Sequence, residues 1–287
     1  MTDLKGITMK LHSSNFSKLI RWFEACKVPV IIAFSGGVDS SVVAFAARQA
    51  LGNDATAVTA NYNTLASEDL VNATIVAKEI GIKHIVTNYD ELKNSQFIKN
   101  DKLRCFYCRT ELARHLIEES KKIGAGLIVD GTNIDDLSDF RPGIIALRQY
   151  GIRSPLVEEG IRKDEVRLIA KSLNLSVYDR PANSCLASRI PTGSLITMPK
   201  LGRIEKSESL VKAIFRVRQV RVRDHQKLAR IEVARNEIQN LFDMTKLDLL
   251  DSKLKALGFE HVTIDIAGYI EKEVRHTMKQ SNIFSHD

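Results

Sequence analysis

The chain has 287 residues, of which 42 are Lys or Arg and 35 are Asp or Glu, so its formal net charge is +7 at pH 7. A hydrophobic share of 44% and a charged share of 27% are ordinary for a globular protein and exclude a disordered chain, a collagen and a coiled coil. The longest apolar run, 28–34, is far shorter than the roughly 18 residues of a membrane span, and the first residues lack a secretory signal. We therefore expect a cytoplasmic protein that does not bind membranes.

The excess of positive charge lies in one segment, residues 200–235. This segment contains eleven Lys or Arg and four Asp or Glu, so the rest of the chain is balanced. A charge run of this kind is typical of a solvated surface, of a site for a small phosphate-bearing ligand or of an RNA-binding surface. We favour a small anionic, nucleotide-like substrate. RNA, including tRNA, is less favoured, because no appended RNA module and no interleaving of basic and aromatic residues is visible.

Apolar runs alternate with helix-like segments over the first two thirds of the chain. Strands are predicted at residues 28–34, 55–60, 84–87 and 127–129, and helices at 41–50, 70–80, 111–123 and 160–173. This alternation is typical of the α/β class, in which helices cover both faces of a parallel sheet. Ligands of such sheets bind beyond the carboxyl ends of the strands.

The pattern changes after a proline-rich loop at residues 179–199. Helices are predicted beyond it at 200–214, 237–242 and 247–257, and strands at 219–225, 228–234 and 261–267. We therefore expect two domains, an α/β domain at 1–194 and a small basic α+β domain at 195–287.

One glycine-rich motif follows the first predicted strand. Its residues are Ser35, Gly36, Gly37, Val38, Asp39, Ser40 and Ser41. The glycines permit a tight turn close to a phosphate, and the following helix N-terminus presents free N–H groups to an anion. Asp39 supplies a carboxylate that could hold Mg²⁺. A lysine following the glycines, as in the Walker pattern, is missing, which disfavours transfer of a γ-phosphate.

The motif resembles the SGGxDS signature of the PP-loop ATP pyrophosphatase superfamily. That resemblance implies an adenine-nucleotide alpha-hydrolase-like fold and an enzyme that cleaves ATP between its α and β phosphates. Such enzymes adenylate an oxygen of the substrate and release pyrophosphate.

Further segments narrow the resemblance to one family. They are Asp130–Asp136 (DGTNIDD), Arg141–Gly143 (RPG), Pro181–Pro191 (PANSCLASRIP), Val222–His225 and Leu228–Val233. Together they resemble the LarE-like sulfur transferases, which insert sulfur into the nickel-pincer cofactor. The resemblance implies that ATP adenylates a carboxylate of a pyridinium-dicarboxylate mononucleotide and that sulfur then displaces AMP. A tRNA-thiolating enzyme, a PP-loop amide synthetase and an RNA-binding module without activity are the alternatives.

The resemblance also implies roles for individual residues. Residues 35–41 and Gly131 would bind ATP, Asp39 would hold Mg²⁺, and Cys185 would handle the sulfur. We expect Arg141 and Arg189 to bind anionic groups of the ligands, because guanidinium forks suit carboxylates and phosphates. The loop at 61–64 is expected near adenine from its position after the second strand. The family further implies a homo-oligomer.

The cysteines leave the sulfur source open. Cys105, Cys108 and Cys185 could hold a [4Fe–4S] cluster, since C-x-x-C plus one distant cysteine supplies three thiolates. The other hypotheses are a sacrificial Cys185 that gives up its own sulfur, a zinc site completed by His115, and reduced structural thiols. Cys26 is expected to be a buried small hydrophobe.

Four aspartates stand near the DGTNIDD segment and could be metal ligands. They are Asp130, Asp135, Asp136 and Asp139. Asp side chains more often cap helices and close turns, and we favour that interpretation for at least two of them.

Overall fold

The chain divides into two units after Cys185, earlier than the expected boundary after residue 194. The computed structural model describes residues 4–137 and 141–269, with side chains from residue 14 onward. Unit 1 ends at Cys185 and unit 2 begins at Leu186. The boundary lies at this point because residues 186–189 form a short 3-10 helix that packs against elements of unit 2. Residues 185–189 (CLASR) are therefore divided between the two units.

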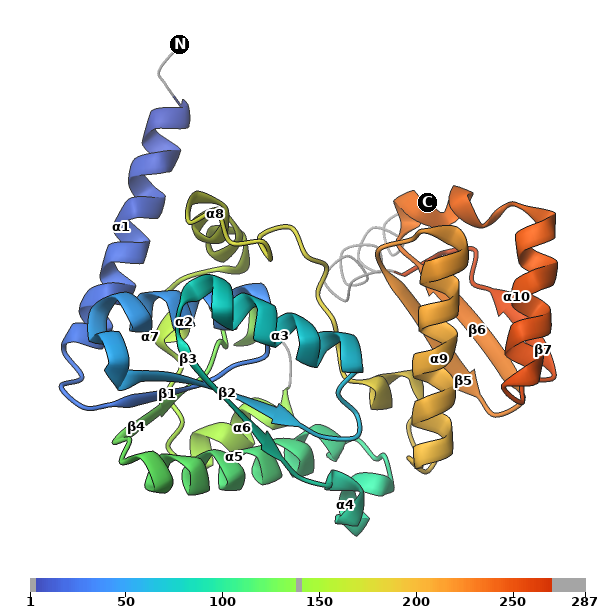
Figure 1. The fold of residues 1–287 in the computed structure, drawn as a ribbon, viewed down its shortest axis with the longest axis horizontal. Coiled ribbons are helices and arrows are strands. Elements are labelled where there is room, and N and C mark those ends of the chain that lie inside the picture. The colour runs from blue at the N-terminus through green and yellow to red at the C-terminus, as the bar shows by residue number, and fades with distance from the viewer. Residues whose placement is uncertain (1–3, 138–140, 270–287) are drawn as a thin grey trace, which may run out of the picture. The chain divides into compact units, whose positions relative to one another are not determined.

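A parallel sheet of four strands forms the centre of unit 1 (Figure 1). The strands are β1 (Val30–Ala33), β2 (Ala55–Asn61), β3 (Lys83–Asn88) and β4 (Leu127–Val129). Their order is β3-β2-β1-β4, with Val30 opposite Ala55 on one side and Leu127 on the other. The predicted α/β class and parallel sheet are confirmed. Since the chain adds β2 on one side of β1 and β4 on the other, the topological switch point lies between β1 and β4.

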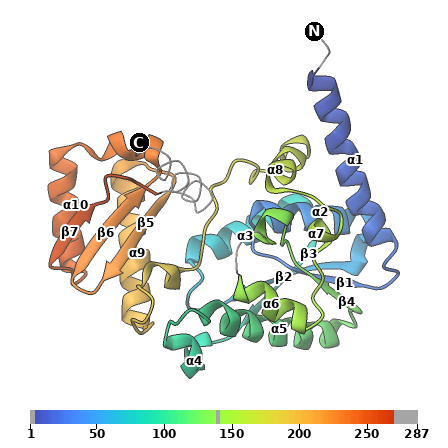
Figure 2. The same ribbon diagram turned by 180° about the vertical axis from the view of Figure 1, so that it is seen from behind.

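Helices cover both faces of this sheet (Figures 1 and 2). They are α1 (Leu4–Glu24), α2 (Val38–Leu51), α3 (Ser67–Ile80), α4 (Ser95–Ile98), α5 (Arg104–Ile123), α6 (Pro142–Gln149), α7 (Pro155–Glu158) and α8 (Lys163–Ser172). Short 3-10 helices lie at η1 (Gly52–Asp54), η2 (Glu91–Lys93) and η3 (Ile134–Leu137). Val30 and Ile32 pack in one core with α1, α2, α3 and α8, whereas Ile31 packs in a second core with α5 and α6. The period-2 alternation of a strand produces these two cores.

Unit 2 is a small α+β unit, as predicted. Its elements are η4 (Leu186–Arg189), α9 (Met198–Phe215), β5 (Val220–His225), β6 (Leu228–Val233), η5 (Arg235–Leu241), α10 (Met244–Ala256) and β7 (His261–Ile264). β5 pairs antiparallel with β6, and β6 pairs parallel with β7. Val220 and Val222 join a separate core with α9 and α10. Among the described helices of both units, none has the length and apolar character needed to cross a membrane.

Candidate nucleotide and thiol sites

The glycine-rich motif forms the turn between β1 and α2. Gly37 is the N-cap of α2 and no side chain caps the helix, so its first N–H groups face the turn. Gly36 has φ +67°, and a Cβ there would lie 2.5 Å from the Cα of Ala73 in α3. Only glycine therefore fits between the loop and α3. The N-terminus of α2 is left open as a site for an anion.

Hydroxyl groups fix the shape of this loop. The Oγ atoms of Ser35 and Ser40 lie 3.1 Å apart, and the backbone N of Gly37 donates to Ser35 Oγ at 3.3 Å. Ser41 Oγ donates to the Gly37 carbonyl at 2.8 Å. The serines predicted to contact phosphate therefore hold the loop in a defined conformation.

The segment after β4 lies directly against the first turn of α2. A Cβ on Gly131 would be 2.7 Å from the backbone N of Ser40, so a glycine is required here as well. Asn133 Nδ2 donates to Asp39 Oδ1 at 3.2 Å. The structure thus brings Gly131 and the glycine-rich loop together at the switch point, although they are distant in sequence.

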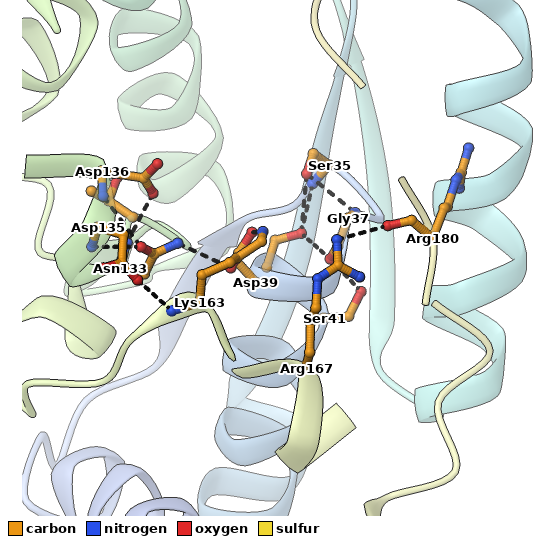
Figure 3. A network of polar contacts seen from close by, with 12 residues as sticks. Ser35, Gly37, Asp39, Ser41, Asn133, Asp135, Asp136, Lys163, Arg167 and Arg180 are labelled. Carbon is orange, nitrogen blue, oxygen red and sulfur yellow. Dashed lines mark hydrogen bonds and ion pairs between the residues drawn. The ribbon is translucent and has the colours of Figure 1, made fainter. Parts of the chain in front are cut away.

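Lys163 contributes a cation that the sequence did not reveal. Its Nζ forms an ion pair with Asp39 Oδ2, and its backbone N donates to Asp135 Oδ2 at 2.7 Å (Figure 3). Asp135 also accepts from Arg162 at 2.9 Å, and these contacts fix the start of α8. No local pattern distinguishes Lys163 from the other charges of an amphipathic helix. A lysine therefore lies beside the open N-terminus of α2, although none follows the glycines in sequence.

Three aspartates of the DGTNIDD region act in turns and ion pairs. Asp130 accepts from Thr132 N at 3.0 Å and from Thr132 Oγ1 at 2.7 Å, as in an Asx-turn. Asp136 accepts from Asn133 N at 3.1 Å and pairs with Arg141. The expectation that at least two of these residues have structural roles is confirmed. Asp139 lies outside the described residues.

The loop after β2 is held by a buried carboxylate. Glu91, 1% exposed, accepts from the backbone N of Asn63 at 3.0 Å and of Thr64 at 2.7 Å. The loop lies at the carboxyl edge of the sheet, as predicted, and its proximity to adenine stays a prediction. Beside it, Tyr62 stacks on Tyr89 with ring centroids 5.4 Å apart.

The three predicted sulfur-handling cysteines lie in one neighbourhood of unit 1. Cys105 and Cys108 are one turn apart at the start of α5, with Cys105 exposed. Loss of hydration raises the pKa of the Cys108 thiol to about 12; the nearby Arg109 opposes the rise and Cys185 adds to it. Cys185 also lies near Arg104, whose Nη2 lies 3.7 Å from Cys105 Sγ.

The described side chains do not form a metal site. No group of three or more Cys, His, Asp or Glu among residues 14–137 and 141–269 could hold a metal ion. The described side chains therefore support neither the expected [4Fe–4S] cluster nor the zinc alternative. His115 packs edge-on against Tyr89 at 4.4 Å. Cys26 is only partly buried, and its thiol donates to the Trp22 carbonyl at 3.3 Å.

Several arginines of unit 2 pair with carboxylates. Arg189, predicted to bind an anion, is 1% exposed, and its Nε and Nη2 donate to Glu208 at 2.8 and 3.1 Å. Arg203 pairs in the same way with Asp224, and Arg223 with Glu232. This placement gives Arg189 a structural contact in place of the predicted ligand contact. The acids in these pairs were already counted in residues 200–235, so the net positive charge of that segment is unchanged.

Comparisons with curated proteins identify relatives over most of the chain. An uncharacterized protein of Synechocystis sp. is 41% identical over 239 residues, which are 83% of this chain and 89% of that protein. The pyridinium-3,5-bisthiocarboxylic acid mononucleotide synthase of Lactiplantibacillus plantarum is 30% identical over 255 residues, 88% of this chain and 91% of that enzyme.

More distant similarity is limited to part of the chain. A family model described as asparagine synthase matches residues 25–99, which include the glycine-rich loop. A tRNA-specific 2-thiouridylase of Wolbachia sp. is 26% identical over 54% of this chain and 52% of that enzyme.

Proposed function

Since the chain belongs to the PP-loop family that includes the pyridinium-3,5-bisthiocarboxylic acid mononucleotide synthase, we propose that it is an ATP-dependent sulfur transferase. Its proposed substrate is a pyridinium-dicarboxylate mononucleotide, a precursor of the nickel-pincer cofactor. The observation that supports ATP use most directly is the open N-terminus of α2, with Gly131 and Lys163 beside it.

The first proposed step is adenylation. A substrate carboxylate oxygen attacks the α-phosphorus of ATP, and pyrophosphate leaves. The N–H groups of α2 and the Lys163 ammonium would stabilise the negative charge on the phosphates. Asp39 is the proposed ligand of the Mg²⁺ that accompanies ATP, because its carboxylate stands at the start of α2. Arg141, at the start of α6, is a proposed further anion ligand.

The second proposed step is sulfur transfer from a cysteine. The Cys185 thiolate attacks the acyl carbon, AMP leaves and a thioester forms. Breaking the Cβ–Sγ bond of Cys185, with loss of its Cα proton, leaves the sulfur on the substrate and dehydroalanine on the protein. Adenylation is needed because a free carboxylate lacks a good leaving group.

An ATP–pyrophosphate exchange assay tests the first step. We expect exchange with the pyridinium-dicarboxylate mononucleotide and none with tRNA. Mass spectrometry of the protein after turnover tests the second step through loss of hydrogen sulfide at Cys185. Exchange with tRNA alone would favour the thiouridylase alternative, which the partial similarity to such enzymes supports.

A further inference from the structure

The segment that leads to Cys185 is held by side chains from two helices. We name residues 178–183 the strap. Arg167 of α8 donates through Nη1 to the Tyr178 carbonyl at 2.8 Å and through Nη2 to the Arg180 carbonyl at 3.1 Å. Figure 3 shows Arg167 reaching from α8 to the backbone of Arg180. The beginning of the strap is thus attached to the helix that also carries Lys163.

A single carboxylate holds the rest of the strap. Asp69, in the first turn of α3, accepts from Arg180 Nη2 at 3.0 Å through Oδ1 and from Asn183 Nδ2 at 2.6 Å through Oδ2. The side chain of Asp69 is 17% exposed, so these contacts are partly shielded from water. Asp69 therefore connects two points of the strap to one rigid helix.

The same helix also contacts the nucleotide loop. Ala73 lies one turn after Asp69 in α3, and it is the residue against which Gly36 packs. Residues four apart share one face of a helix. One face of α3 thus contacts the strap through Asp69 and the glycine-rich loop through Ala73, one helical turn further on.

The strap ends two residues before Cys185. Cys185 lies near Tyr62 and Cys108, which belong to the loop after β2 and to α5. Residues 181–185 are neither helix nor strand, and the 3-10 helix η4 begins directly after Cys185. The contacts that hold the strap therefore help to set the position of Cys185 beside the C-x-x-C motif.

We propose that Asp69 is a positioning residue for Cys185. By binding Arg180 and Asn183, it fixes the strap so that the Cys185 thiol lies next to Cys105 and Cys108 and at a set distance from the ATP loop. The consequence for sulfur transfer rests on the proposed function, whereas the positioning itself does not.

Thiol cross-linking of the full reduced chain tests this positioning without ATP or substrate. A short bismaleimide should join Cys185 to Cys105 or Cys108 in the wild-type protein, as read by peptide mass spectrometry. Asp69→Asn and Arg180→Gln should each lower the cross-linking rate about tenfold. The double variant should be no slower than Asp69→Asn, because the two substitutions remove the same ion pair. Glu68→Gln, an exposed acid of the same helical turn, should retain the wild-type rate.

Thermal unfolding shows whether a variant loses the position of Cys185 or loses the fold. We expect Asp69→Asn to remain folded at the temperature of the cross-linking reaction. A folded Asp69→Asn protein with the wild-type rate, or a wild-type protein without the cross-link, would overturn the proposal. Cross-linking as expected in a protein that transfers no sulfur would contradict the proposed function and leave the positioning role of Asp69 intact.

Discussion

Lys163 and Asp39 neutralise each other beside a helix N-terminus that otherwise favours anions. An ATP phosphate would give the Lys163 ammonium a second partner in the same place. Charged hydrogen bonds contribute about 1.5–3 kcal/mol, so we expect Lys163→Met to weaken binding of ATP about tenfold or more. Calorimetric titration with ATP in the presence of a chelator measures this contribution without Mg²⁺.

Arg162→Gln is the matched control for this variant. It removes a cation from the neighbouring residue, whose guanidinium instead contacts Asp135. We expect its affinity for ATP to stay close to that of the wild type. Equal losses in both variants would show that the net charge of the region, and not the position of Lys163, determines binding.

Gly131 allows the segment after β4 to lie against α2. In Gly131→Ala the new Cβ would stand 2.7 Å from Ser40 N, so α2 or the segment must shift. We expect weaker ATP binding and a stability loss of about 1–3 kcal/mol, the usual range for overpacking. Gly202→Ala is the control, because a Cβ at that position would meet no atom within 4 Å and its φ is not positive. That variant should bind ATP normally, and a loss there would contradict the steric explanation.

At the residue level, local spacing predicted segments that the fold brings together. The glycine-rich loop and Gly131 were predicted from sequence and come together in the structure. Lys163 and Asp69 were not predicted, because each acts on a residue that is remote in sequence. Arg189 was assigned to a ligand because its partner Glu208 is likewise invisible to a reading of local motifs.

At the scale of elements, apolar runs predicted the sheet better than the helix ends. The four strands of unit 1 and their parallel order follow from buried apolar runs. α5 begins at Arg104, well before the predicted start at residue 111, because polar residues and cysteines fill its first turns. That difference matters for function, since it places the C-x-x-C motif on a helix.

His84 makes the stability of unit 1 depend on pH. Its Nε2 lies 2.7 Å from Thr59 Oγ1, which donates to the Phe34 carbonyl, and burial lowers the pKa of His84. The folded state therefore binds a proton less readily than the unfolded state. This contribution to stability is present above the unfolded pKa of about 6.5 and is lost as the pH falls through the folded pKa.

We expect His84→Gln to flatten the decline in unfolding free energy between about pH 7.5 and pH 5. Urea titrations across this range, followed by the fluorescence of Trp22 in unit 1, provide the measurement. His225→Gln, at an exposed position of unit 2, is the control. A decline as steep in His84→Gln as in the wild type would exclude His84 as the cause.

At the scale of the whole molecule, some of the arginines of unit 2 have an internal role. Arg189, Arg203 and Arg223 each pair with a carboxylate of unit 2, although sequence counting alone favoured an anion-binding surface. The count could not show this, because the pairs form between helices and strands that are separated in sequence. The paired acids are already part of the count, so the segment at 200–235 keeps its excess of positive charge.

The buried Arg189–Glu208 pair stabilises unit 2. Glu208 accepts two bonds from Arg189 and one from Val222 N at 3.0 Å, and its side chain is only 10% exposed. Removing one partner of a buried pair typically costs about 3–5 kcal/mol, whereas replacing both by apolar groups is often nearly neutral. We expect Glu208→Ala to lower the unfolding temperature of unit 2, and Arg189→Met/Glu208→Leu to restore much of it.

Calorimetry and fluorescence together distinguish the two units in this experiment. The sequence has one tryptophan, Trp22, which lies in unit 1 and reports on that unit alone. Glu208→Ala should shift the calorimetric transition of unit 2 and leave both the Trp22 transition and ATP binding unchanged. If the Trp22 transition falls by the same amount, the units unfold together. In that case the boundary after Cys185 separates two compact regions of one cooperative protein, and the buried arginines stabilise the ATP site as well.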